Sequence, residues 1–153
     1  MKELLNKVEL EFDLNVLAGK INRQCNEIGG GIVFVCVLKG GFMFFSDLVK
    51  KINYPIKIDF IQCKSYNDME RGDIKIIQDI TSDIQNHTVF IVDDILDSGE
   101  TMKFLYKHFT LLGANNVKTV WSCISESISL TIVNSCCCMS LYDLHCIKSI
   151  LIG

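Results

Sequence analysis

The sequence predicts an α/β domain in which a mainly parallel sheet is flanked by helices on both faces. Two apolar runs, residues 32–38 and 89–92, have the composition of strands buried on both sides. Each run leads through a short turn of small residues into a pattern with helical spacing. The chain of 153 residues, 49% of them hydrophobic, is long enough for one substantial core. We therefore expect a single domain over residues 1–153, with its core at about 14–124.

The first part of the chain predicts an arm followed by a helix. Residues 1–13 are polar and mixed, and we interpret them as a short strand or arm. Apolar side chains then recur at helical spacing from Leu14 to Ile28, and the three glycines that follow end this helix. The helix presents an apolar stripe, so we assign it to the core.

The next segment is a buried strand over residues 32–38, a Lys39-Gly40-Gly41 turn and a helix over residues 42–52. Small residues in the turn let backbone N–H groups approach a ligand closely. A Gly-Gly turn between a strand and a helix is also ordinary loop chemistry. The turn alone therefore does not define a site.

Two further strands are expected at residues 57–64 and 73–80, joined by the polar residues 65–72. The joining residues show no apolar periodicity that would pack them against the core, so we expect a mobile loop at the tip of a hairpin. Beside a phosphate site such a loop would act as a lid, although an exposed hairpin tip without function has the same composition.

The most informative stretch is residues 89–102. Asp93 and Asp94 follow the apolar run, a turn over residues 97–101 contains Gly99, and a helical pattern continues to Leu112. A turn that opens a helix presents free N–H groups and the positive end of the helix dipole, which suit a phosphate. Two adjacent carboxylates repel each other, and this repulsion is relieved when they bind hydroxyl groups or a divalent cation. A last strand over 117–124 completes the sheet, and these turns all fall at carboxyl ends of strands, where ligands bind. The pattern predicts a sugar-phosphate cradle with Mg²⁺ nearby.

Composition excludes several classes of protein. A net charge of −3 without a basic block argues against a nucleic-acid binder. No apolar run has the length of a membrane span, and Met1-Lys2-Glu3 does not open a signal peptide, so we expect a cytoplasmic protein. The 8 cysteines are interpreted as reduced, mostly buried filler. Cys136-Cys137-Cys138 lacks zinc spacing, although Cys146 and His145 leave a metal site as an alternative.

The stretch from Val89 to Met102 resembles the phosphoribosyl-pyrophosphate (PRPP) signature of type I phosphoribosyltransferases. The resemblance implies that Asp93 and Asp94 hold the ribose and, with Asp143, the metal. It makes Asp97 the acid or base near the purine N7. It also implies a 5′-phosphate site formed by Asp97, Ser98, Gly99, Glu100 and Thr101.

Other segments match the same family. Leu38-Lys39-Gly40-Gly41 resembles its pyrophosphate loop, in which the peptide before the lysine is commonly cis. Lys39, Gly40 and Lys148 would then bind pyrophosphate. Ser65 and Tyr66 match the start of the family's flexible loop.

Residues 15–120 are most similar to bacterial hypoxanthine/guanine phosphoribosyltransferases. This resemblance implies a purine-salvage transferase that uses Mg²⁺, PRPP and a 6-oxopurine to give IMP or GMP, and that forms a homodimer or homotetramer. The match degrades after Val120: Ser125 and Glu126 stand where the family has a lysine for the purine 6-oxo group. Residues 125–153 would form a shortened hood over the site, in which Tyr142 or Trp121 either stacks on the base or only packs.

We therefore expect weakened or altered purine use. The alternative is a regulator that keeps the fold and binds PRPP or a nucleotide. An unrelated doubly wound domain, such as a response regulator, would not need the Ser98-Gly99-Glu100-Thr101 turn directly before a helix.

Overall fold

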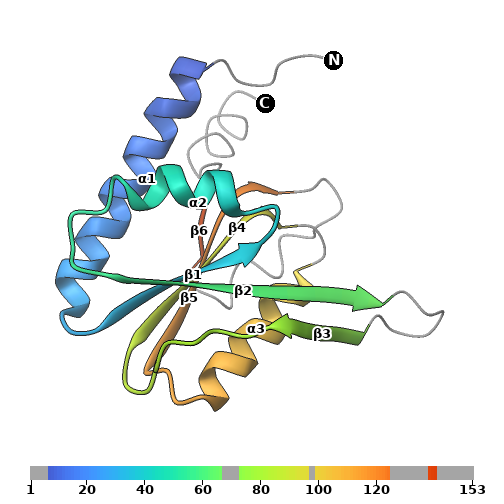
Figure 1. The fold of residues 1–153 in the computed structure, drawn as a ribbon. Coiled ribbons are helices and arrows are strands. Elements are labelled where there is room, and N and C mark those ends of the chain that lie inside the picture. Colours follow the sequence, from blue (N-terminus) through green and yellow to red (C-terminus); the bar gives the residue numbers. More distant parts are fainter. Residues whose placement is uncertain (1–6, 67–72, 97–98, 125–137, 141–153) are drawn as a thin grey trace, which may run out of the picture.

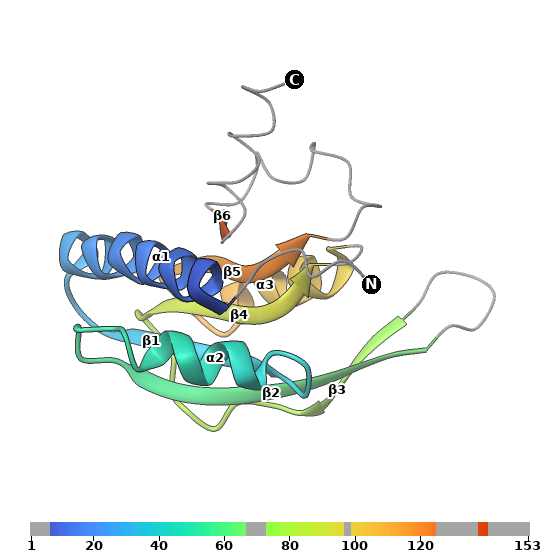
Figure 2. The same cartoon turned by 90° about the horizontal axis from the view of Figure 1, so that it is seen from above.

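The computed structural model describes residues 7–66, 73–96, 99–124 and 138–140. Within them the chain forms a sheet of strand order β3-β2-β1-β4-β5-β6 with helices on both faces (Figure 1). All neighbouring strands are parallel except β2 and β3, which form an antiparallel hairpin that runs out past α2 (Figure 2). The elements are α1 (Lys7–Ile28), β1 (Ile32–Leu38), α2 (Phe42–Val49), β2 (Lys57–Tyr66), β3 (Asp73–Gln78), β4 (Thr88–Leu96), α3 (Glu100–Leu111), β5 (Asn116–Ile124) and β6 (Cys138–Ser140).

The predicted fold class is confirmed, and strand β1 has the predicted bounds. The arm expected over residues 1–13 is wrong for residues 7–13, because α1 already begins at Lys7. This part of the chain is rich in Glu, Leu and Lys, which favour helices even where the apolar pattern is mixed. An ion pair between Glu11 and Lys51 also ties the early helix to the end of α2.

Smaller differences concern element ends. Helix α2 ends at Val49 rather than near residue 52, and β3 ends at Gln78 rather than at residue 80. Strand β2 continues to Tyr66, because Ser65 and Tyr66 pair with Ile74 and Asp73 of β3. Ser65 and Tyr66 therefore lie in the strand and not in the loop that the composition suggested. The remaining residues of that loop, 67–72, lie outside the described part of the chain.

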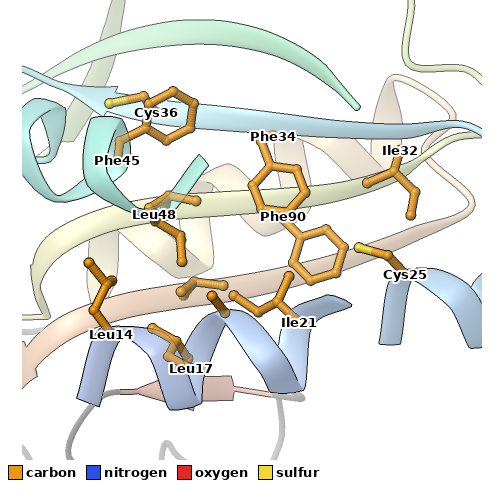
Figure 3. Packing of buried hydrophobic residues seen from close by; sticks show 13 residues of the cluster. Leu14, Leu17, Ile21, Cys25, Ile32, Phe34, Cys36, Phe45, Leu48 and Phe90 are labelled. Carbon is orange, nitrogen blue, oxygen red and sulfur yellow. The ribbon is translucent and has the colours of Figure 1, made fainter. Parts of the chain in front are cut away.

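Alternation along the strands creates two buried clusters, one on each face of the sheet. On the first face, Leu14, Leu17 and Ile21 of α1 pack against the sheet (Figure 3). Here the rings of Phe34 and Phe90, from the neighbouring strands β1 and β4, stack with centroids 4.7 Å apart. Helix α1 is thereby fixed over the middle of the sheet, and α2 joins the same cluster through Phe45 and Leu48.

Helix α3 covers the opposite face. Its residues Met102, Leu105 and Phe109 are buried against alternate residues of β1, β4 and β5. This is the stripe that the spacing from Met102 to Leu112 predicts. The start of α3 is thereby held beside the carboxyl end of β4.

The cysteines that the structure places agree with the interpretation as buried filler. Cys25 and Cys36 are fully buried free thiols, and Cys63 is partly buried. Burial raises the pKa of Cys25 to about 11, so its thiol is an inert packing group at neutral pH. Cys136, Cys137 and Cys146 lie outside the described residues. Of the helices within the described ranges, none combines the length and the apolar character that a bilayer crossing needs.

A buried carboxylate anchors the connection between β3 and β4. Asp59 of β2 is only 8% exposed and accepts hydrogen bonds from the backbone N–H groups of Thr81 (2.9 Å) and Ser82 (2.7 Å). Burial disfavours the charged form of Asp59 and by itself would raise its pKa. The hydrogen bonds from Thr81 and Ser82, together with the one from the backbone N–H of Phe60, outweigh this effect and hold the pKa of Asp59 below its usual value.

We expect Asp59→Asn to lower the free energy of unfolding by about 1–3 kcal/mol at pH 7, because an amide cannot accept all of these bonds. A carboxyl with a lowered folded pKa contributes stability above its unfolded pKa of about 3.9. It loses that contribution as the pH falls through the folded value. Urea unfolding of both proteins at pH 7 and below pH 4 should therefore show a difference that shrinks in acid. A difference independent of pH would contradict the assignment.

Candidate active site

The predicted acid pair lies at the carboxyl end of β4. The backbone N–H of Asp94 donates a hydrogen bond of 2.8 Å to Oδ1 of Asp93. Burial, together with a hydrogen bond shared between its carboxyl group and that of Asp94, raises the pKa of Asp93 to about 7. Two carboxylates forced together in this way favour a hydroxyl donor or a cation, either of which relieves their repulsion.

The chemistry of the pair fits Mg²⁺, which prefers oxygen ligands and usually takes one or two carboxylates. No group of three or more metal-ligating side chains gathers within the described ranges. When bound here, Mg²⁺ would also take water and oxygens of a substrate as ligands, as is usual at phosphate-transfer sites.

The turn after β1 packs directly onto these acids. The Leu38–Lys39 peptide is cis, in agreement with the expectation from the resemblance. A Cβ atom added to Gly40 would lie 3.0 Å from Oδ1 of Asp94. One added to Gly41 would lie 2.9 Å from the carbonyl oxygen of Val37 and 3.2 Å from Cα of Asp93. The loop from residue 39 to 41 and the acid pair thus share one site, although about fifty positions separate them in the sequence.

The third part of the site is the start of α3. Gly99 precedes the helix with φ = 76°, a left-handed conformation that glycine adopts without steric cost. Glu100 and Thr101 form the first turn of α3, where N–H groups without helical partners and the helix dipole favour an anion. Asp97 and Ser98, the other residues predicted for the phosphate turn, lie outside the described residues.

The β2–β3 hairpin carries a feature that the sequence did not suggest. The ring of Tyr66 contacts the ammonium groups of Lys64 and Lys75, which are 5.1 Å and 5.0 Å from its centroid. Lys64 and Lys75 are direct partners in the antiparallel register, so both side chains stand on one face of the hairpin. Only the pairing of the strands brings these charges together, and the predicted loop residues Ser65 and Tyr66 stand beside them. The structure does not bring Ser65 or Tyr66 into contact with the acid pair.

Several predicted residues cannot be placed. Asp143, expected at the metal, and Lys148, expected at pyrophosphate, lie outside the described residues, and so do Ser125, Glu126 and Tyr142. Trp121, considered as a base-stacking residue, is 2% exposed and belongs to the cluster beneath α3, which agrees with the packing interpretation.

Comparison with protein families matches residues 1–134 to the phosphoribosyl transferase domain. The chain therefore belongs to the phosphoribosyltransferase family. This agrees with the arrangement of a glycine turn, an acid pair and a helix start at the carboxyl ends of β1 and β4.

The relatives lie in one branch of that family. The chain is 33% identical to the hypoxanthine phosphoribosyltransferase of Buchnera aphidicola over 80% of its own length and 69% of the relative's. It is 47% identical to the human hypoxanthine-guanine phosphoribosyltransferase over 52% of this chain, but that match spans only 42% of the human enzyme. The crystal structure of a hypoxanthine-guanine phosphoribosyltransferase from Bacillus anthracis superimposes with a TM-score of 0.77 at 32% identity, covering 86% of this chain and 79% of the other. Within the family, the chain stands with the hypoxanthine/guanine phosphoribosyltransferases.

Proposed function

We propose that this protein transfers the ribosyl-5-phosphate group of PRPP to a 6-oxopurine, hypoxanthine or guanine, and so forms IMP or GMP and pyrophosphate in purine salvage. The observation that carries the proposal is the close packing of Gly40 and Gly41 against Asp94 and Asp93. This packing joins a backbone surface suited to pyrophosphate to carboxylates suited to ribose hydroxyls.

Each part of the site has a role in this reaction. Asp93 and Asp94 would accept hydrogen bonds from the ribose hydroxyls and orient the sugar. The backbone of Lys39 and Gly40 would bind the pyrophosphate group, and the turn before α3 would bind the 5′-phosphate. When bound, Mg²⁺ would neutralise charge that develops on the departing pyrophosphate. The roles of Asp97 as proton acceptor, of Lys148 at pyrophosphate and of Asp143 at the metal follow from the resemblance alone.

The purine half of the site is expected to be weaker than in ordinary relatives. With Ser125 and Glu126 in the region of the family's lysine, the 6-oxo group loses a charge-assisted hydrogen bond. Such a bond contributes about 1.5–3 kcal/mol, or about ten- to hundredfold in binding. The same substitution favours a second candidate function, a PRPP- or nucleotide-binding regulator without efficient transfer.

We further propose a cytoplasmic homodimer or homotetramer that uses neither nucleic acid nor a membrane. The free thiols of Cys25, Cys36 and Cys63 suit a reducing compartment. Light scattering at several concentrations tests the oligomeric state, and a monomer throughout would contradict that part of the proposal.

The decisive assay is Mg²⁺-dependent release of pyrophosphate from PRPP with hypoxanthine, guanine, xanthine or adenine. We expect turnover with a 6-oxopurine, at an efficiency below that of ordinary relatives. Asp97→Asn should lower kcat by about a hundredfold or more, since proton transfer contributes on this scale, while PRPP affinity changes little. Equal losses in kcat and affinity, or no loss in either, would contradict a proton-transfer role for Asp97. PRPP binding without turnover of any base would favour the regulator.

A further inference from the structure

Trp121 holds a buried polar group that has no partner among the described residues. It is the only tryptophan of the chain, is 2% exposed and packs in the cluster formed with Met102 and Leu105 of α3. Its indole Nε1 is buried and has no hydrogen-bond partner among the residues that the structure describes. Buried donors are nearly always paired, because an unpaired one loses its bond to water without replacement. The indole N–H therefore calls for a functional explanation.

The register of the sheet places Trp121 beside the acid pair. Trp121 of β5 is the direct parallel partner of Asp93 in β4. Side chains of directly paired residues stand on the same face, and neighbouring strands are about 4.8 Å apart. On its other side Asp93 meets Gly41, where an added Cβ would lie 3.3 Å from Asp93 Oδ1. The carboxyl group of Asp93 thus lies against the glycine turn, and Trp121 is the strand partner of Asp93 on the other side of β4.

The present partners of Asp93 belong to Asp94. Oδ1 of Asp93 accepts the backbone N–H of Asp94, and the two carboxyl groups also share a hydrogen bond. A ribose hydroxyl or a cation that engages Asp94 competes with this carboxyl–carboxyl contact. Once the contact is lost, Asp93 has an oxygen in need of a donor, and its partner residue in β5 carries an indole N–H that has no partner among the described residues.

We propose that Trp121 is a positioning residue for Asp93: its indole N–H donates a hydrogen bond to the Asp93 carboxylate when a pentose phosphate occupies the site. The inference rests on the proposed function, because it requires the sugar to engage Asp94. The indole N–H, which has no partner among the described residues, would thus form its hydrogen bond only in the ligand-bound protein. Trp121 then fixes the orientation of Asp93 without touching the substrate itself.

The direct test is the ¹H–¹⁵N resonance of the indole, which is a single signal because the chain has one tryptophan. Saturating PRPP with Mg²⁺, and ribose 5-phosphate alone, should shift this signal downfield and slow its exchange with solvent. Pyrophosphate without Mg²⁺ should leave it in place, because neither a sugar nor a cation then engages Asp94. An unmoved signal with PRPP, or an equal shift with pyrophosphate, would overturn the proposal.

Trp121→Phe supplies a second test, because it keeps an apolar ring and removes the donor. The dissociation constant for PRPP should rise about tenfold or more. The melting temperature without ligand should change little, because the removal of the unpaired donor offsets the smaller volume of the phenyl ring. Phe109→Leu, in the same cluster, is the matched control: it should lower the melting temperature and leave PRPP affinity unchanged. A Trp121→Phe protein that melts earlier but binds PRPP normally would show that Trp121 only packs.

PRPP titration by calorimetry distinguishes a failure of the proposed function from a failure of the role of Trp121. Absence of PRPP binding by the unaltered protein overturns the proposed function and this inference with it. Binding of PRPP with an unmoved indole signal overturns the role of Trp121 alone.

Discussion

Asp94→Asn is expected to lower kcat/KM for PRPP by about a hundredfold or more, since hydrogen bonds to a charged group contribute about 1.5–3 kcal/mol each. The substitution keeps the size of the side chain and removes its charge. Asp94 faces the glycine turn, with Oδ1 placed 3.0 Å from the position of a Cβ on Gly40, so its carboxylate lies where the proposed ribose and pyrophosphate subsites would meet. The loss should appear both in PRPP titration calorimetry and in the pyrophosphate-release assay.

Asp47→Asn is the matched control, because it makes the same chemical change on the exposed face of α2. Asp47 pairs only loosely with Lys50, at 3.6 Å, and both side chains are largely exposed. Exposed pairs of this kind contribute little to stability, so PRPP binding and unfolding should be unchanged. A similar loss in both variants would indicate a general effect of net charge, and full activity of Asp94→Asn would remove this residue from the proposed site.

Gly41→Ala is expected to weaken PRPP binding by about tenfold or more and to lower the free energy of unfolding by about 1–3 kcal/mol. The backbone of Gly41 has φ = −67°, which any residue adopts, so the effect comes from crowding. The new methyl group would lie 2.9 Å from the carbonyl oxygen of Val37, a backbone atom that cannot turn away. The turn must therefore move relative to Asp93, and the two subsites lose their common geometry.

Gly19→Ala is the control for Gly41→Ala, because nothing lies within 4 Å of the added methyl group in the middle of α1. It should leave PRPP affinity unchanged and stabilise the helix by about 0.5–1 kcal/mol. Calorimetric titration and urea unfolding of both variants give the comparison. If Gly41→Ala behaves like Gly19→Ala, the close packing of the turn on the acids has no part in PRPP binding.

The fold class and the position of the acid pair at the end of a strand could be predicted from the sequence because both depend on short stretches. A strand buried on both faces must be an unbroken apolar run, so the apolar residues 32–38 predict strand β1. A turn of small residues between a strand and a helix is equally local, and the stretch from Val89 to Met102 combines it with two acids. The predicted ligand-binding roles of these local patterns came from the family resemblance.

The same local reasoning misjudged the start of α1, where helix propensity and the ion pair of Glu11 with Lys51 outweigh a mixed apolar pattern. It also placed Ser65 and Tyr66 in a loop. Their pairing with β3 depends on residues across the hairpin, which a reading of composition does not take into account.

The sequence by itself determined where most strands and helices lie, and it predicted which residues carry the phosphate and sugar chemistry. Tertiary structure alone decided that Gly40 meets Asp94, that Thr81 and Ser82 anchor on Asp59, and that Trp121 stands beside Asp93. The physical reason is that hydrophobic periodicity reports burial along one element, whereas these contacts depend on the order and register of strands distant in the chain.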